Sequence, residues 1–65
     1  MNAEYIELLN ICIKGVTVKK GEIEIKQLNA TELDEKFYWK SMLHQTVNQL
    51  ELLETLRTKY LELHK

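Results

Sequence analysis

The chain has 65 residues, of which 45% are hydrophobic and 29% are charged, and its formal net charge is −1. Sixty-five residues allow one domain, residues 1–65, and a chain of this size that folds alone buries only about 60% of its unfolded surface. The near-neutral balance disfavours a charge-driven nucleic-acid binder, and the apolar share is too high for a disordered chain.

The single cysteine, Cys12, cannot form an internal disulfide. The sequence contains neither a secretory signal nor an apolar run of about 18 residues, which a membrane-spanning helix needs. We therefore expect a cytoplasmic protein in a reducing environment, with no contact to a membrane.

Residues 3–14 are predicted to form a short amphipathic helix. At about 100° per residue, the polar side chains of Glu4, Glu7 and Lys14 fall opposite one apolar arc. Gly15 follows directly, and glycine is the residue type that most often ends a helix. The apolar arc contains Tyr5, Ile6, Leu8, Leu9, Cys12 and Ile13.

Residues 16–26 alternate apolar and polar side chains on both sides of Gly21, which predicts a β-hairpin. A two-residue turn at Lys20 and Gly21 would bring oppositely charged Lys19 and Glu22 together. The same register would place four β-branched side chains on one face of the hairpin: Val16, Val18, Ile23 and Ile25.

Residues 31–64 contain neither glycine nor proline and are predicted to form one long helix, capped by Asn29 or Thr31. The predicted fold class is therefore α+β, mainly α, in the order α-β-β-α. In the alternative, this helix breaks near residues 44–48, where poorer helix formers cluster, and folds back to close a monomeric bundle.

The long helix predicts association with other chains. It would span about 50 Å, whereas a compact globule of this length is only about 28 Å across. Its apolar residues sweep about 200° of the helix circumference, more than one packing surface requires. We expect a helical homo-oligomer, most simply a homodimer, with an interface made by Trp39, Leu43, Leu50, Leu53, Leu56, Tyr60 and Leu63.

A heptad seam along the same helix is interrupted by polar side chains at Thr46 and Arg57. These interruptions favour a packed helical bundle over an extended parallel coiled coil. The interrupted set is Trp39, Leu43, Thr46, Leu50, Leu53, Arg57 and Tyr60.

No group of residues in the sequence has the pattern of a catalytic, metal or cofactor site. Ser41 and His44 share a helix face, but Asp34, the only aspartate, lies about 15 Å from His44 along the helix. Neither His44 nor His64 has a glutamate three residues before it, as helical metal sites do. We therefore predict a protein that is not an enzyme and that binds no cofactor.

The predicted function is that of a small regulatory protein that acts as a homo-oligomer on a macromolecular partner, most simply another protein. Its size is that of the compact inhibitors and adaptors expected from phages and mobile elements. One alternative is a dimeric DNA-binding regulator that contacts a groove through Lys19 and Lys20 of its β-hairpin. Another is an oligomeric sponge or sensor that holds a small ligand near Trp39 and Tyr60.

Overall fold

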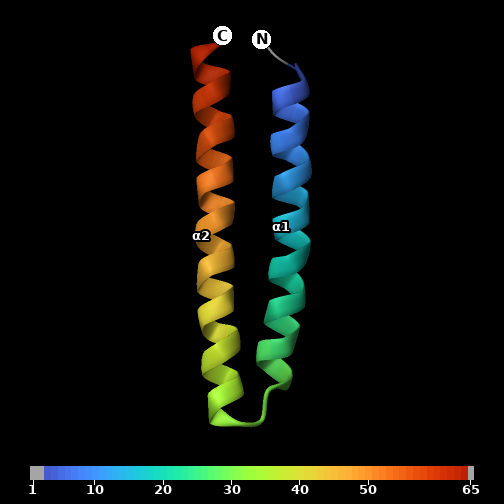
Figure 1. Ribbon diagram of the computed structural model, residues 1–65, viewed down its shortest axis with the longest axis vertical. Coiled ribbons are helices and arrows are strands. Elements are labelled where there is room, and N and C mark those ends of the chain that lie inside the picture. Colours follow the sequence, from blue (N-terminus) through green and yellow to red (C-terminus); the bar gives the residue numbers. More distant parts are fainter. Residues whose placement is uncertain (1–2, 65) are drawn as a thin grey trace.

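The structure, a computed structural model, is a hairpin of two antiparallel α-helices (Figure 1). It describes residues 3–64. Helix α1 spans Ala3–Asn29 and helix α2 spans Leu33–Leu63. Residues 30–32 connect them, so both free helix ends lie together at one end of a rod that measures 49 × 15 × 10 Å between Cα atoms.

The predicted β-hairpin at residues 16–26, and with it the α-β-β-α order, is wrong. These residues lie inside α1, and residues 3–64 contain no strand. On a helix, residues two apart point about 200° from each other, so an alternating pattern divides between opposite faces. Val16 and Ile23 face α2, whereas Val18 and Ile25 point away from it and are 56% and 59% exposed.

The two glycines do not interrupt α1. Gly15 does not end the first helix at residue 14, Gly21 does not form a turn, and neither has a positive φ. Each costs about 1 kcal/mol relative to alanine in a helix interior. The pairing with α2 offsets this cost, because a helix that ended at Lys14 would leave half of α2 without a neighbour.

The start and length of α2 also differ from the prediction. Its N-cap is Glu32, in an extended conformation and without a side-chain cap hydrogen bond, so neither Asn29 nor Thr31 caps it. The helix continues without a break through residues 44–48, so the alternative of a fold-back there is wrong. Because α1 is about 40 Å long and α2 about 46 Å, α2 does not overhang its own chain as expected.

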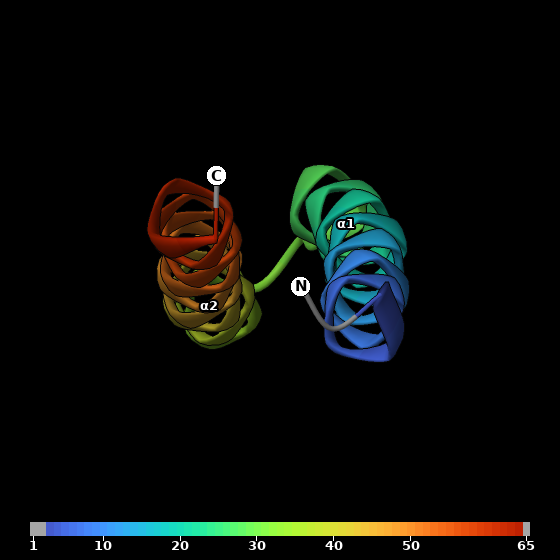
Figure 2. The same ribbon diagram turned by 90° about the horizontal axis from the view of Figure 1, so that it is seen from above.

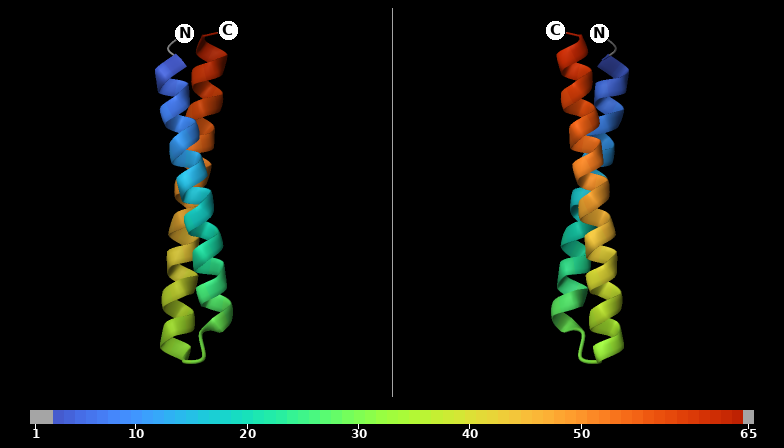
Figure 3. Two further views of the ribbon diagram at one scale, coloured as in Figure 1. Left: turned by 90° about the vertical axis from the view of Figure 1, so that its right-hand side faces the viewer. Right: turned by 90° about the vertical axis from the view of Figure 1, so that its left-hand side faces the viewer.

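The two helices pack through a regular heptad repeat, which we call the interhelical seam. Its buried and half-buried residues recur in alternating steps of three and four, the spacing of a coiled coil. The helices cross each other in the side views, as coiled-coil pairs do (Figure 3). The seam consists of Ile6, Leu9, Ile13, Val16, Lys20, Ile23 and Gln27 of α1 with Trp39, Leu43, Thr46, Leu50, Leu53, Arg57 and Tyr60 of α2.

The two polar residues that interrupt the heptad pattern of α2 both lie in this seam. Thr46 is only 2% exposed, and its hydroxyl donates to the carbonyl oxygen of Met42 at 2.8 Å, within its own helix. Arg57 donates from Nη1 to Oδ1 of Asn10 on α1, also at 2.8 Å. The heptad pattern of α2 is therefore a true seam, and its two polar members are both satisfied by hydrogen bonds.

The core that results is small. Among the described residues, the buried apolar side chains are Leu9, Ile23 and Ala30. Seen end on, the hairpin is a single pair of helices, and no third element covers either side of it (Figure 2). Many large apolar side chains therefore remain at the surface, and their positions identify the candidate site.

Candidate docking surface

Three contacts across the seam fix how the two antiparallel helices are aligned along each other. Two of them approach α2 from one side of the seam, since Tyr5 and Lys26 share one heptad position. The third approaches from the other side, where Asn10 lies. The contacts are Tyr5 with Tyr60 (ring centroids 4.5 Å apart), Lys26 Nζ over Trp39 (4.9 Å to the ring centroid) and Asn10 with Arg57.

On the Tyr5 side of the seam, both helices present apolar side chains to solvent. The most exposed are Leu63 at 81% and Leu8 and Leu52 at 60% each, while Tyr5 and Leu56 are 37% and 39% exposed. Positions that flank a coiled-coil seam on one side form a continuous surface across both helices. We call this set the apolar face; it consists of Tyr5, Leu8, Leu52, Leu56 and Leu63.

The apolar face occupies the half of the hairpin that carries the free helix ends. Toward the connection, the same side of the seam becomes more polar, with Lys19 and Lys26 on α1 and Gln45 and Gln49 on α2 beside the exposed Tyr38. On the opposite side of the seam, α1 contributes Leu28, which is 84% exposed near the connection, and α2 contributes Leu33 and Phe37 at the same end of the rod. The apolar face itself is thus confined to one side of the seam and to the half of the rod that carries the free helix ends.

A second exposed set runs along α1, on the side away from α2. Ile11, Val18 and Ile25 recur at heptad spacing and are 67%, 56% and 59% exposed. We call this set the outer stripe. Sequence reasoning missed it because the hairpin prediction assigned Val18 and Ile25 to a strand, although their heptad spacing with Ile11 was visible.

The predicted interface residues divide between the seam and the apolar face. Leu56 and Leu63 belong to the apolar face. Tyr5, Leu8 and Leu52 complete this face but were not among the predicted interface residues. The other predicted residues, which are half-buried, face α1 within the same chain: Trp39, Leu43, Leu50, Leu53 and Tyr60.

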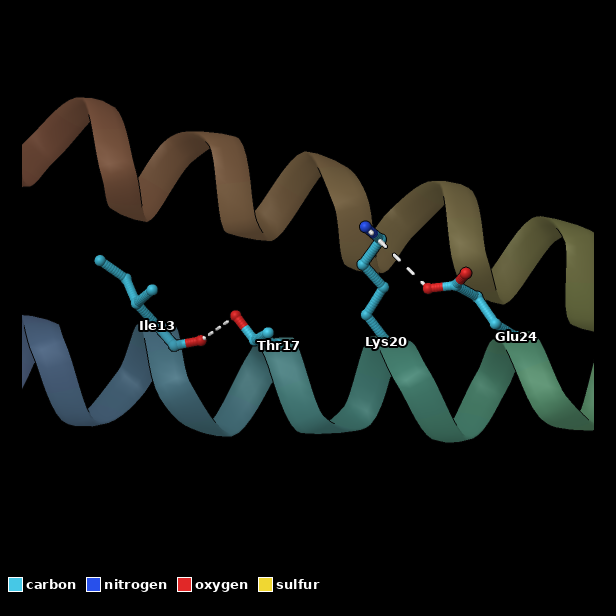
Figure 4. Close-up of polar contacts among 4 residues, drawn as sticks. All are labelled: Ile13, Thr17, Lys20 and Glu24. Atoms are coloured by element: carbon cyan, nitrogen blue, oxygen red, sulfur yellow. Dashed lines mark hydrogen bonds and ion pairs between the residues drawn. The ribbon is translucent and has the colours of Figure 1, made fainter.

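The two lysines predicted to contact a partner lie in the middle of α1 rather than at a hairpin tip. Lys19 is exposed, whereas Lys20 is half-buried in the seam, with its Nζ 4.0 Å from Oε1 of Glu24 (Figure 4). Thr17, on the same stretch, donates its hydroxyl to the carbonyl oxygen of Ile13 at 2.7 Å. Neighbouring helical residues point about 100° apart, so Lys19 and Lys20 do not form one basic patch.

Ser41 and His44 both line an open depression on the surface of α2. Every residue that lines it belongs to this one helix, so the depression is a surface groove rather than a cavity between elements. Within residues 3–64, no three His, Cys, Asp or Glu side chains gather where they could hold a metal ion. Neither described helix is long and apolar enough to span a bilayer.

Comparison of the chain with protein families, curated proteins and solved structures finds no match. The apolar face and the outer stripe are the features of the chain that indicate a function.

Proposed function

We propose that this chain is a non-enzymatic, cytoplasmic binding protein that acts by docking its helical hairpin onto other α-helices, as a small adaptor or inhibitor does. The observation that carries this proposal is the amount and arrangement of exposed apolar surface. Apolar side chains at heptad spacing form the surface through which one helix packs against another. Contiguous apolar patches on a soluble protein typically mark interaction sites.

Three features of the chain count against the other functions considered. The open groove at Ser41 and His44 contains no third group to orient a catalytic histidine. Lys19 and Lys20 point in different directions, and the β-ribbon that would carry them into a DNA groove is absent from residues 3–64. Trp39 and Tyr60 lie about 31 Å apart along α2, too far to hold one small ligand within a chain.

The proposal is tested by photo-cross-linking in cells that express the chain. A photoreactive phenylalanine analogue is placed at Leu52 in the apolar face, at Val18 in the outer stripe, and at Thr55 as a control. Thr55 is exposed among polar residues of α2, so it lies on the same helix as Leu52 but in a polar environment.

We expect covalent adducts from Leu52 or Val18 that are absent from Thr55. The mass of each adduct, less the 7.7 kDa of the chain, shows whether a second copy or another protein was captured. Equal adduct yields at all three positions, or none at any of them, would refute docking through these surfaces.

A further inference from the structure

We infer that the occupant of the apolar face is a second copy of this chain, seated so that the two hairpins run parallel with their connections at the same end. The inference rests on the proposed docking function and names the partner for one of its two surfaces. The pair would form a four-helix bundle in which every helix has two helical neighbours.

The exposed area has the size that a dimer requires. The chain exposes 5249 Å², whereas a globular monomer of 7.7 kDa exposes about 4,300 Å². The excess of about 900 Å² is close to the ~800 Å² that each partner buries in a stable interface of standard size. Burial against one second copy of the chain would therefore account for the excess exposed area.

The width of the apolar face selects a partner with two helices. Tyr5, Leu56 and Leu63 lie next to the seam, whereas Leu8 and Leu52 lie farther out, one on each helix. A single helix in the groove between α1 and α2 would cover the inner residues and leave the outer leucines in water. A second hairpin covers both.

The position of the face along the rod selects the parallel arrangement. With the connections at the same end, apolar residues meet apolar residues near the free helix ends. With the connections at opposite ends, the same residues would meet Lys19 and Lys26, and burying a lysine charge against leucine side chains is costly. In the parallel arrangement, these lysines can pair with Glu22 and Glu35 of the other copy, which lie on the same side of the seam.

Cys12 reports on this arrangement because it is exposed on the Tyr5 side of the seam, one turn from Leu8. In the parallel pair, the two Cys12 side chains lie at the same height and approach each other across the bundle axis. In the opposite arrangement, they are displaced along the axis by about 15 Å. A short bis-maleimide therefore joins them only in the parallel dimer.

Light scattering on the purified full chain across a dilution series tests the dimer. We expect twice the 7.7 kDa chain mass for the native protein and for Thr55→Glu, and the single-chain mass for Leu52→Glu. Because Leu52 is 60% exposed in the hairpin, Leu52→Glu should keep its helical circular dichroism, which separates loss of the dimer from unfolding.

Several results would overturn the inference. A native protein of single-chain mass at all concentrations, or a Leu52→Glu variant that remains a dimer like Thr55→Glu, would eliminate this interface. A dimer whose two Cys12 side chains are not cross-linked by the bis-maleimide would eliminate the parallel arrangement. A monomeric native protein that still gives heavier adducts from Leu52 in cells would refute the second copy but leave the proposed docking function intact.

Discussion

Replacing Ile23 or Ile25 with alanine distinguishes the helix from the strand at the stretch where sequence and structure disagree. A β-hairpin would place both side chains on one face, so both replacements would cost a similar amount of stability. In α1 the two point in opposite directions, since Ile23 is 4% exposed and Ile25 is 59% exposed. The two variants should therefore differ sharply.

The expected magnitudes follow from burial. Ile→Ala removes about three methylene equivalents, each worth ~0.8 kcal/mol when fully buried. Scaled by exposure, the loss is about 2.3 kcal/mol for Ile23 and about 1.0 kcal/mol for Ile25. Alanine returns about 0.4 kcal/mol of helix propensity in both variants. The net costs are about 2 kcal/mol for Ile23→Ala and about 0.6 kcal/mol for Ile25→Ala.

Thermal unfolding followed by circular dichroism at one protein concentration measures this difference. For a chain of 65 residues, each kcal/mol shifts the melting temperature by about 7 °C. Ile23→Ala should therefore melt about 13 °C below the native protein, and Ile25→Ala about 4 °C below it. Equal shifts in the two variants would refute the helical assignment of residues 16–26.

Two further replacements test how α1 and the seam are built. Gly21→Ala should raise the melting temperature by several degrees, because helical alanine is favoured by about 1 kcal/mol and, beyond the adjoining helix backbone and the two chain neighbours, nothing lies within 4 Å of the added Cβ. A lower melting temperature would contradict a continuous α1. Thr46→Val should stabilise the protein by about 0.8 kcal/mol in urea denaturation, because the lost hydroxyl bonds only within its own helix and the gained methyl is buried. Destabilisation of more than about 1 kcal/mol would show that the Thr46 hydroxyl contributes through a contact that the seam geometry does not contain.

The long second helix and its surplus of apolar surface were predictable from local sequence. No glycine or proline occurs between Thr31 and His64, and good helix formers dominate. The lengths of the two helices were not predictable in the same way. How far α1 continues past Gly15 depends on what it packs against, and α2 supplies that contact.

The failure at residues 16–26 has a definite physical cause. β-branched residues around a glycine are a strong local signal for a hairpin. The same residues fit a helix when they recur every seven positions, as Val16 with Ile23 and Val18 with Ile25 do. An alternating run is therefore ambiguous on its own, and the heptad spacing decides once a partner helix is available.

The candidate surface was only partly predictable. That α2 carries more apolar surface than one partner can cover followed from its helical wheel, and Leu56 and Leu63 were identified from it. The contribution of Tyr5 and Leu8 could not follow, because it depends on α1 lying antiparallel along the whole of α2. Trp39 and Tyr60 face α1 for the same reason.

The distribution of polar and apolar residues favours an assembly larger than one hairpin. The seam includes Lys20, Gln27, Thr46 and Arg57, residues that weaken a two-helix core, while leucines and isoleucines lie outside it. A sequence that stabilised the isolated hairpin alone would have the reverse arrangement, since buried apolar area is the main source of stability. Polar seam positions instead fix the register of a pair, and the outer apolar positions supply the contacts that a further layer of helices needs. In a dimer through the apolar face, the outer stripe of α1 would still be exposed, which leaves a surface for a different partner.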